Sequence, residues 1–146
     1  MTRSKPAKVK LPDGRDLFGR RPRDANKEAR IQAAVIEWIR WCAPQVVAYA
    51  VPNGGLRTKS EAARLKWQGV LPGIPDIGLV FPGGQAGFFE VKPPKEYLSD
   101  EQKEMLPRLE ALGARCAVVR SIEDARAAFE VWGIETRETK TGPPRF

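Results

Sequence analysis

Histidine is absent from the 146 residues, and only two cysteines are present, Cys42 and Cys116. Without histidine there are no Ser-His-Asp triads, no Cys-His dyads, no histidine-ligated zinc and no imidazole acid or base. The two cysteines lie far apart in the sequence, so they form no Cys-x-x-Cys pair and no disulfide framework. This usage is typical of a reducing compartment.

Long apolar runs are also lacking. No stretch approaches the ~18 consecutive apolar residues of a membrane-spanning helix. Residues 1–30 are basic and contain no apolar segment of the kind found in secretory signals. We therefore expect a soluble cytoplasmic protein without membrane contact. The apolar content of 42% is sufficient for one packed domain.

The positive charge is concentrated at one end of the chain. Residues 1–27 contain nine Lys or Arg against three Asp, which accounts for most of the net charge of +7. Because residues 1–23 also contain several prolines and glycines and no apolar period, we predict a basic irregular arm there. A folded domain is expected over 24–133 and a tail over 134–146. A basic arm favours a polyanionic partner such as nucleic acid; the alternative is a solubilising segment with no partner.

Apolar periodicity and capping signals predict eight elements. They are helices over 25–42, 58–68, 99–113 and 121–132, and strands over 46–51, 76–81, 88–92 and 114–120. Thr58-x-x-Glu61 and Ser99-x-x-Gln102 are capping boxes. The order predicts an α/β fold with a small mixed sheet flanked by helices. The hairpin supplies an antiparallel pair of strands, and the helical crossover supplies a parallel pair.

One strand carries an ionisable residue inside an apolar sequence. The two-residue period of a strand puts Glu90 and Lys92 on one face and Phe89 and Val91 on the other. A buried carboxylate is paired or binds a metal, and the hairpin can bring Asp76 close to Glu90. Since two adjacent carboxylates repel, we expect Mg²⁺ or Mn²⁺ held by Asp76, Glu90 and a backbone carbonyl near Val91. Lys92 would hold or deprotonate the attacking water. The alternative is a Glu90–Lys92 ion pair at a sheet edge, with Asp76 capping a loop.

Several motifs together point to a known family. They are Glu28 and Gln32 at the start of the first helix, Pro52-Asn53-Gly54-Gly55, Gly73-Ile74-Pro75-Asp76, Phe89-Glu90-Val91-Lys92 and Ser99-x-x-Gln102. With these motifs, residues 26–132 resemble the VRR-NUC (virus-type replication-repair nuclease) family of the PD-(D/E)XK nuclease superfamily. The resemblance implies a restriction-endonuclease-like αβββαβ core. Asp76, Glu90 and Glu28 would be acidic metal-site residues, Lys92 the catalytic lysine, and Gln102 a polar residue lining the site.

The resemblance also implies a function. We expect a metal-dependent endonuclease that acts on branched or structured DNA in phage or prophage replication, recombination or repair. DNA would be the partner, a homodimer is possible, and no organic cofactor is required. Three alternatives remain: a nuclease for ordinary duplex DNA, a non-catalytic nucleic-acid-binding module on a nuclease fold, and a structural or adaptor protein.

Other residues have two possible roles each. Glu28 is a metal-site residue or a favourable charge at a helix start, and Gln102 lines the site or only completes the capping box. Asn53 touches a phosphate or shapes a turn. A basic cluster contacts DNA or is a solvated helix face; it comprises Arg57, Lys59, Arg64 and Lys66. The tryptophans are expected as core or interface anchors, and only Trp67 stands in a basic context suited to base stacking.

Overall fold

The computed structural model describes residues 25–52 and 58–138, and its centre is a four-stranded mixed sheet. The strands lie in the order β1 (Val47–Ala50), β2 (Ile77–Val80), β3 (Ala86–Val91) and β4 (Arg115–Val119). β1–β2 and β2–β3 are antiparallel, and β3–β4 is parallel. The predicted combination of a hairpin and a helical crossover is therefore confirmed.

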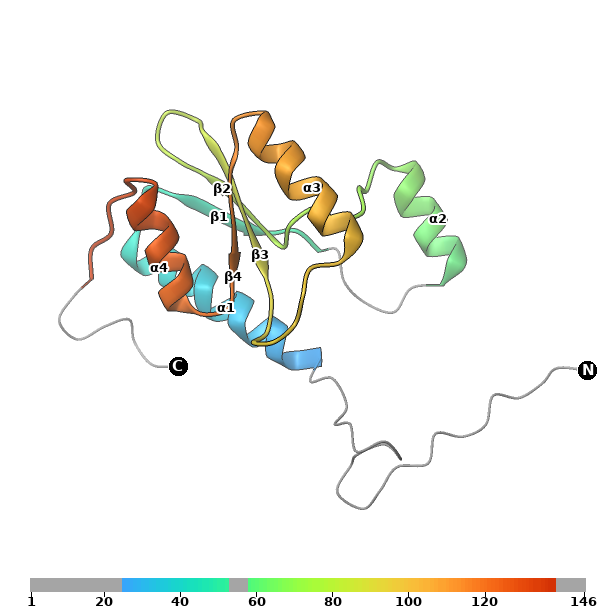
Figure 1. Cartoon of the computed structure of the whole chain (residues 1–146), viewed down its shortest axis with the longest axis horizontal. Coiled ribbons are helices and arrows are strands. Elements are labelled where there is room, and N and C mark those ends of the chain that lie inside the picture. The colour runs from blue at the N-terminus through green and yellow to red at the C-terminus, as the bar shows by residue number, and fades with distance from the viewer. Residues whose placement is uncertain (1–24, 53–57, 139–146) are drawn as a thin grey trace, which may run out of the picture.

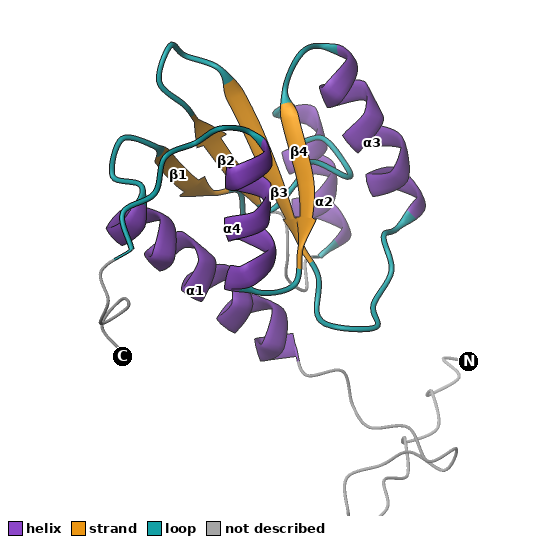
Figure 2. Cartoon of the chain, turned by 60° about the vertical axis from the view of Figure 1, so that its left-hand side comes forward, coloured by secondary structure: helices purple, strands orange, loops and turns teal. Residues whose placement is uncertain are grey.

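Helices cover both faces of this sheet. α1 (Ala25–Cys42) and α4 (Ile122–Val131) lie on one side, and α3 (Asp100–Ala111) lies on the other (Figure 2). α2 (Lys59–Trp67) stands apart from the sheet on the side of α3 (Figure 1). Among the described residues, no helix combines the length and the apolar character that crossing a lipid bilayer requires.

The helix starts follow the predicted capping chemistry. The side chain of Thr58 accepts a hydrogen bond from the backbone N–H of Glu61, while Glu61 accepts one from the N–H of Thr58. Ser99 and Gln102 make the same reciprocal pair at the start of α3. Each box satisfies two N–H groups that a helix leaves without internal partners. Both predicted capping boxes are confirmed.

The main core lies between the sheet and the α1/α4 pair. Trp38, Phe89 and Phe129 are fully buried there. The ring of Phe129 lies 5.5 Å from that of Trp38 and 5.7 Å from that of Phe89, centroid to centroid. Such aromatic pairs add stabilisation beyond the area they bury. Trp41 and Trp67 are exposed instead, so these two tryptophans are not core residues.

The hairpin differs from the prediction at its ends. β3 begins at Ala86 rather than 88, because Ala86 and Gly87 continue the ladder opposite Val80 and Leu79. β2 begins at Ile77 rather than Asp76. The side chain of Asp76 takes the Val91 N–H that a longer β2–β3 ladder would use. The Asp76 carbonyl still accepts a hydrogen bond from the Val51 N–H at 2.8 Å. Asp76 therefore stays bonded to the β1 side and lies just before β2, with its side chain toward β3.

Candidate active site

Glu90 occupies an interior strand and is almost fully removed from solvent. Its side chain is 1% exposed and faces α3, while Phe89 and Val91 face the core. The amide Nε2 of Gln102 donates to Glu90 Oε1 at 2.6 Å, and Lys92 Nζ lies 3.7 Å from the same oxygen. Glu90 Oε2 is buried and has no hydrogen-bond partner among the described residues. An oxygen in this state is costly for the fold unless a ligand binds it.

Asp76 meets Glu90 because of the strand register. Ile77 pairs with Phe89, so the residue before β2 lies opposite Glu90. Asp76 Oδ2 accepts a hydrogen bond of 2.9 Å from the backbone N–H of Val91. The predicted proximity of the two carboxylates is thus present. The Oδ2 atom of Asp76 also has a structural role, because it accepts a hydrogen bond from the backbone of β3.

The electrostatics of Glu90 reflect this crowding. Burial, then the negative charge of Asp76, and then the hydrogen bond that a protonated Glu90 makes to Asp76 raise the pKa of Glu90 to about 8, against an ordinary value of 4.5. The charge of Lys92 acts in the opposite direction, and Glu28 adds a smaller upward effect on the same pKa. Two like charges this close cannot both ionise at neutral pH without compensation. The site is therefore deficient in positive charge.

Gln102 has both of the roles that were considered as alternatives. Its Oε1 accepts from the Ser99 N–H at 2.8 Å, which completes the capping box. Its Nε2 donates to Glu90. The two ends of one amide therefore connect the first turn of α3 to the buried carboxylate.

A cavity of about 510 Å³ opens beside these residues. Glu28 and Asp76 share its wall with α2, the loop before β2 and the start of α3. The described residues contain no group of three or more Asp, Glu, Cys or His side chains placed to hold a metal ion. Glu28 thus contributes to the cavity wall and to the local field, but it does not complete a three-carboxylate cluster in this conformation.

The ion-pair alternative is corrected in one respect. Glu90 and Lys92 do lie within ion-pair distance. However, β3 has β2 on one side and β4 on the other, so the pair is not at a sheet edge. Lys92 is only 12% exposed. Two charges in an interior position need more compensation than they would at an exposed edge.

Two positioning residues were not among the predicted site residues, although Gly73 stood in one of the motifs. Gly73 has a φ of +79°, and a Cβ atom there would lie 2.4 Å from the backbone oxygen of Glu101. Only glycine therefore lets the loop before Asp76 pack against the start of α3. Arg120 donates from Nη1 to the Pro93 carbonyl at 2.6 Å, which fixes the chain just after Lys92. The Gly-x-Pro sequence is a signal for the first residue, whereas no local signal reveals the second.

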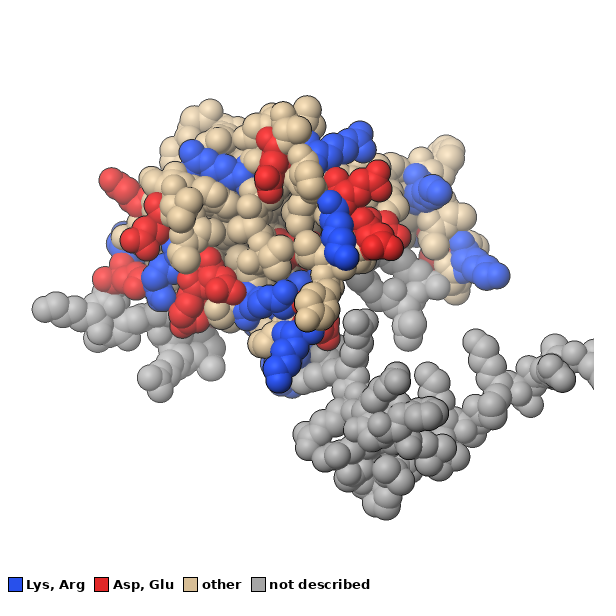
Figure 3. Space-filling model, viewed as in Figure 1, with Lys and Arg blue, Asp and Glu red and all other residues tan. Residues whose placement is uncertain are grey.

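Only some of the predicted nucleic-acid-binding residues lie in the part of the chain that the structure describes. Lys59, Arg64 and Lys66 are exposed on α2, and Lys66 also lines the cavity. Asn53 and Arg57 lie outside the described residues, as does the basic arm over 1–23. Figure 3 shows the basic side chains of α2 at the right, with acidic side chains over α3 beside them. The two rims of the site therefore differ in charge.

Comparison with known proteins agrees with this architecture. The family model for the VRR-NUC domain matches residues 25–123. One solved structure, described as a VRR-NUC domain, is 23% identical and covers 73% of this chain and 97% of its own, with a TM-score of 0.52. Another, described as a VRR-NUC domain protein, is 19% identical and covers 75% of this chain and 90% of its own, with a TM-score of 0.58. At these identities the structures show the fold alone. A search of the curated proteins gives no match.

Proposed function

Because the chain belongs to the VRR-NUC family, whose nuclease domain spans most of it, we propose that it is a divalent-metal-dependent DNA endonuclease. Its substrate would be branched or structured DNA in phage or prophage replication, recombination or repair. One observation carries the proposal. A carboxylate that is 1% exposed lies in an interior strand next to a second carboxylate, and one of its oxygens has no partner among the described residues.

The residues present fit a hard divalent cation. Asp76 and Glu90 supply carboxylate oxygens, and a backbone carbonyl near Val91 would add a third oxygen ligand. Mg²⁺ and Mn²⁺ prefer such oxygens. Glu28, on the same cavity wall, is proposed as a further acidic residue of the site. A bound cation would neutralise phosphate charge and make a coordinated water more acidic.

The protein's own groups have separate tasks in this mechanism. The Val91 N–H fixes Asp76, and the Gln102 amide fixes Glu90, so both carboxylates are held before substrate binds. Lys92 Nζ, on the same face as Glu90, would orient the attacking water, accept its proton when the amine is neutral, and offset charge on the phosphate. The exposed cations of α2 would hold the DNA backbone beside the cavity.

The decisive experiment compares substrates and variants. Labelled single-stranded, duplex, flap and four-way-junction DNA are incubated with EDTA, Mg²⁺ or Mn²⁺. We expect metal-dependent cleavage that is fastest on a branched substrate. It should fall by at least about 1,000-fold in Asp76→Ala, because losing the metal removes several kcal/mol of charge stabilisation. Glu104→Gln, which changes an exposed carboxylate of α3 outside the cavity lining, is the matched control and should cleave normally.

Two results would change the conclusion. Cleavage of plain duplex at the same rate as junctions would indicate the duplex nuclease. Intact DNA binding with no cleavage under any metal condition would indicate the non-catalytic binding module.

A further inference from the structure

Among the four helices of the described residues, α2 alone has no buried residue. A helix of nine residues gains little from its own backbone, and most short helices depend on packing against a core. α2 is held largely at its ends. The Thr58–Glu61 capping box closes the start, and the N–H groups of Gln68 and Val70 bond back to the carbonyls of Arg64 and Leu65 at the end. Its side chains are therefore available for a partner.

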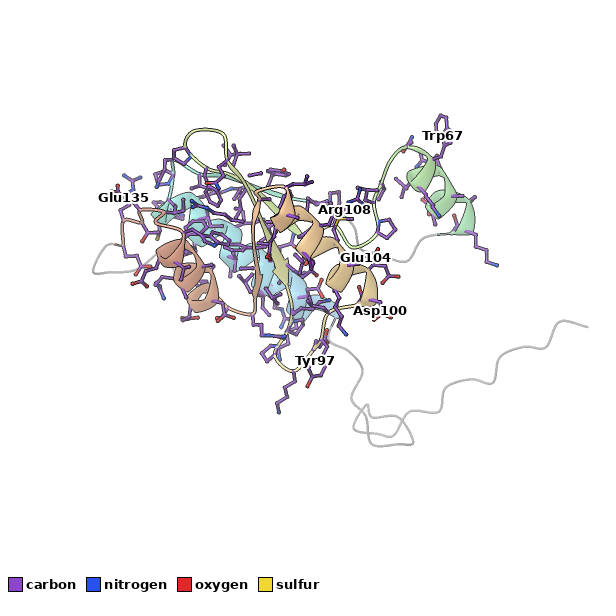
Figure 4. All side chains as sticks on the ribbon, turned by 45° about the horizontal axis from the view of Figure 1, so that its top comes forward. Trp67, Tyr97, Asp100, Glu104, Arg108 and Glu135 are labelled. Atoms are coloured by element: carbon purple, nitrogen blue, oxygen red, sulfur yellow. The ribbon has the colours of Figure 1, made fainter. Side chains whose placement is uncertain are left out.

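The end of α2 presents a large aromatic surface to solvent. Trp67 is 86% exposed, and Leu71 just after it is 51% exposed. Figure 4 shows the indole of Trp67 directed away from the rest of the described chain. Tryptophan combines a wide apolar face with low side-chain entropy, which suits it to recognition of flat groups. Its position here contributes nothing to the core.

The charge around Trp67 selects the kind of partner. α2 contains three basic residues and one acidic residue, whereas α3 contains four acidic residues and two basic ones. In Figure 4, Asp100 and Glu104 mark the acidic rim on α3. A polyanion is therefore attracted to α2 and repelled from α3. Lys66 lines the same cavity as Asp76, so a strand bound along α2 would pass the candidate catalytic carboxylates.

We propose that Trp67 stacks on an unpaired base of the DNA strand that the α2 cations hold beside the cavity. This inference rests on the proposed nuclease function and specifies its substrate class. A base inside a continuous duplex is covered on both faces by its neighbours, while a base in a gap, flap or junction has a face available to an aromatic ring. Trp67 thus makes single-stranded character in the part of the strand that crosses the end of α2 a determinant of specificity.

A second copy of the chain is the main competing occupant of this surface. In a twofold dimer each patch contacts its own copy, so two α2 helices with net positive charge would face one another. This repulsion disfavours the dimer and favours a nucleic-acid ligand.

Binding without metal tests the inference apart from cleavage. In EDTA, affinities are measured for an oligothymidine strand, a gapped duplex and a blunt duplex. We expect Trp67→Ala to weaken binding of the first two by roughly 5- to 150-fold, the range for loss of one stacked base. Blunt-duplex affinity should change less than about two-fold on the same stacking argument. Trp67→Phe should restore most of the loss because a phenyl ring still stacks.

Trp41→Ala is the matched control, because Trp41 is 53% exposed on α1, away from the cavity beside Asp76. It should leave all three affinities unchanged. Oligothymidine should quench tryptophan fluorescence in the wild type and in Trp41→Phe but not in Trp67→Phe. Equal losses on all three substrates, or no loss on any, would overturn the inference. A Trp67→Ala variant with a changed oligomeric mass by light scattering and an unchanged DNA affinity would also overturn the inference.

The two proposals fail in different assays. Trp67-dependent binding without metal-dependent cleavage would reject the nuclease and leave the stacking role standing. Metal-dependent cleavage with Trp67-independent binding would reject stacking alone.

Discussion

Phe89 and Glu90 are neighbours on β3 and are equally hidden from solvent, but they face opposite sides of the sheet. Phe89 lies against Phe129 and Trp132, with ring centroids 5.7 Å and 5.6 Å away. Glu90 meets a second carboxylate and keeps one oxygen without a partner among the described residues. The α1/α4 side of the sheet thus stabilises the fold. The α3 side gives up stability for a charged site.

Phe89→Ala should produce the largest loss of stability. Removing a buried phenyl ring leaves a cavity, and we expect the free energy of unfolding to fall by about 3–5 kcal/mol. Urea denaturation monitored by circular dichroism measures this change. Phe88→Ala, at a half-buried position on the opposite face, is the control and should lose distinctly less. Equal losses would show that the two faces contribute alike.

Glu90→Gln should change stability in the opposite direction. At pH 7 without metal, the wild type must either bury an ionised Glu90 or take up a proton on folding, because the pKa of this carboxyl is raised to about 8. The neutral amide of the variant avoids both costs. We expect the free energy of unfolding to rise by about 2–3 kcal/mol while cleavage is lost. Glu104→Gln should leave both properties unchanged. A destabilised Glu90→Gln protein would contradict the view that Glu90 opposes folding.

The raised pKa of Glu90 also predicts how the stability difference between Glu90→Gln and the wild type changes with pH. The pKa of Glu90 is about 8 in the fold, against 4.5 as the ordinary value. Between these values the folded state retains a proton that the unfolded chain releases, so this contribution to stability falls as pH rises. It is fully present below 4.5 and lost above about 8. The stability gap between Glu90→Gln and wild type in EDTA should therefore widen across this window, and a constant gap would argue against the shift.

The smallest effect separates the two roles of Gln102. Ser99→Ala removes part of the capping box and should cost about 1 kcal/mol of unfolding free energy. Gln102→Ala should cost a similar amount and also release Glu90. We therefore expect cleavage to fall at least about ten-fold more in Gln102→Ala than in Ser99→Ala, the result of losing a charge-assisted hydrogen bond at the site. Equal rates would restrict Gln102 to capping.

Much of this architecture was predictable from the sequence, because local rules govern it. Capping boxes, alternation along β3 and turn glycines each act over a few residues, and they place Glu90 and Lys92 on one face. The hairpin also indicated that Asp76 would approach Glu90. All of these features are determined by residues that lie close together in the sequence.

Other features depend on contacts distant in the chain. The contact of Arg120 with the Pro93 carbonyl arises only when separate elements meet. The sequence offered an exposed face for α2 as one alternative, but it could not show that the whole helix lacks a buried residue. The depth of Glu90 depends on β3 lying inside the sheet, which no single segment specifies. The two bonds of the Gln102 amide were treated as alternatives because a sequence pattern shows one partner at a time.

The Gln102 amide has a consequence for which sequences this fold can tolerate. Capping boxes accept glutamate or glutamine at this position with little difference to the helix. Here a glutamate would keep the cap but turn a third carboxylate toward Glu90, where the amide now donates a hydrogen bond. Exchange of glutamine for glutamate is therefore not neutral at position 102, although the helix cap alone would allow it.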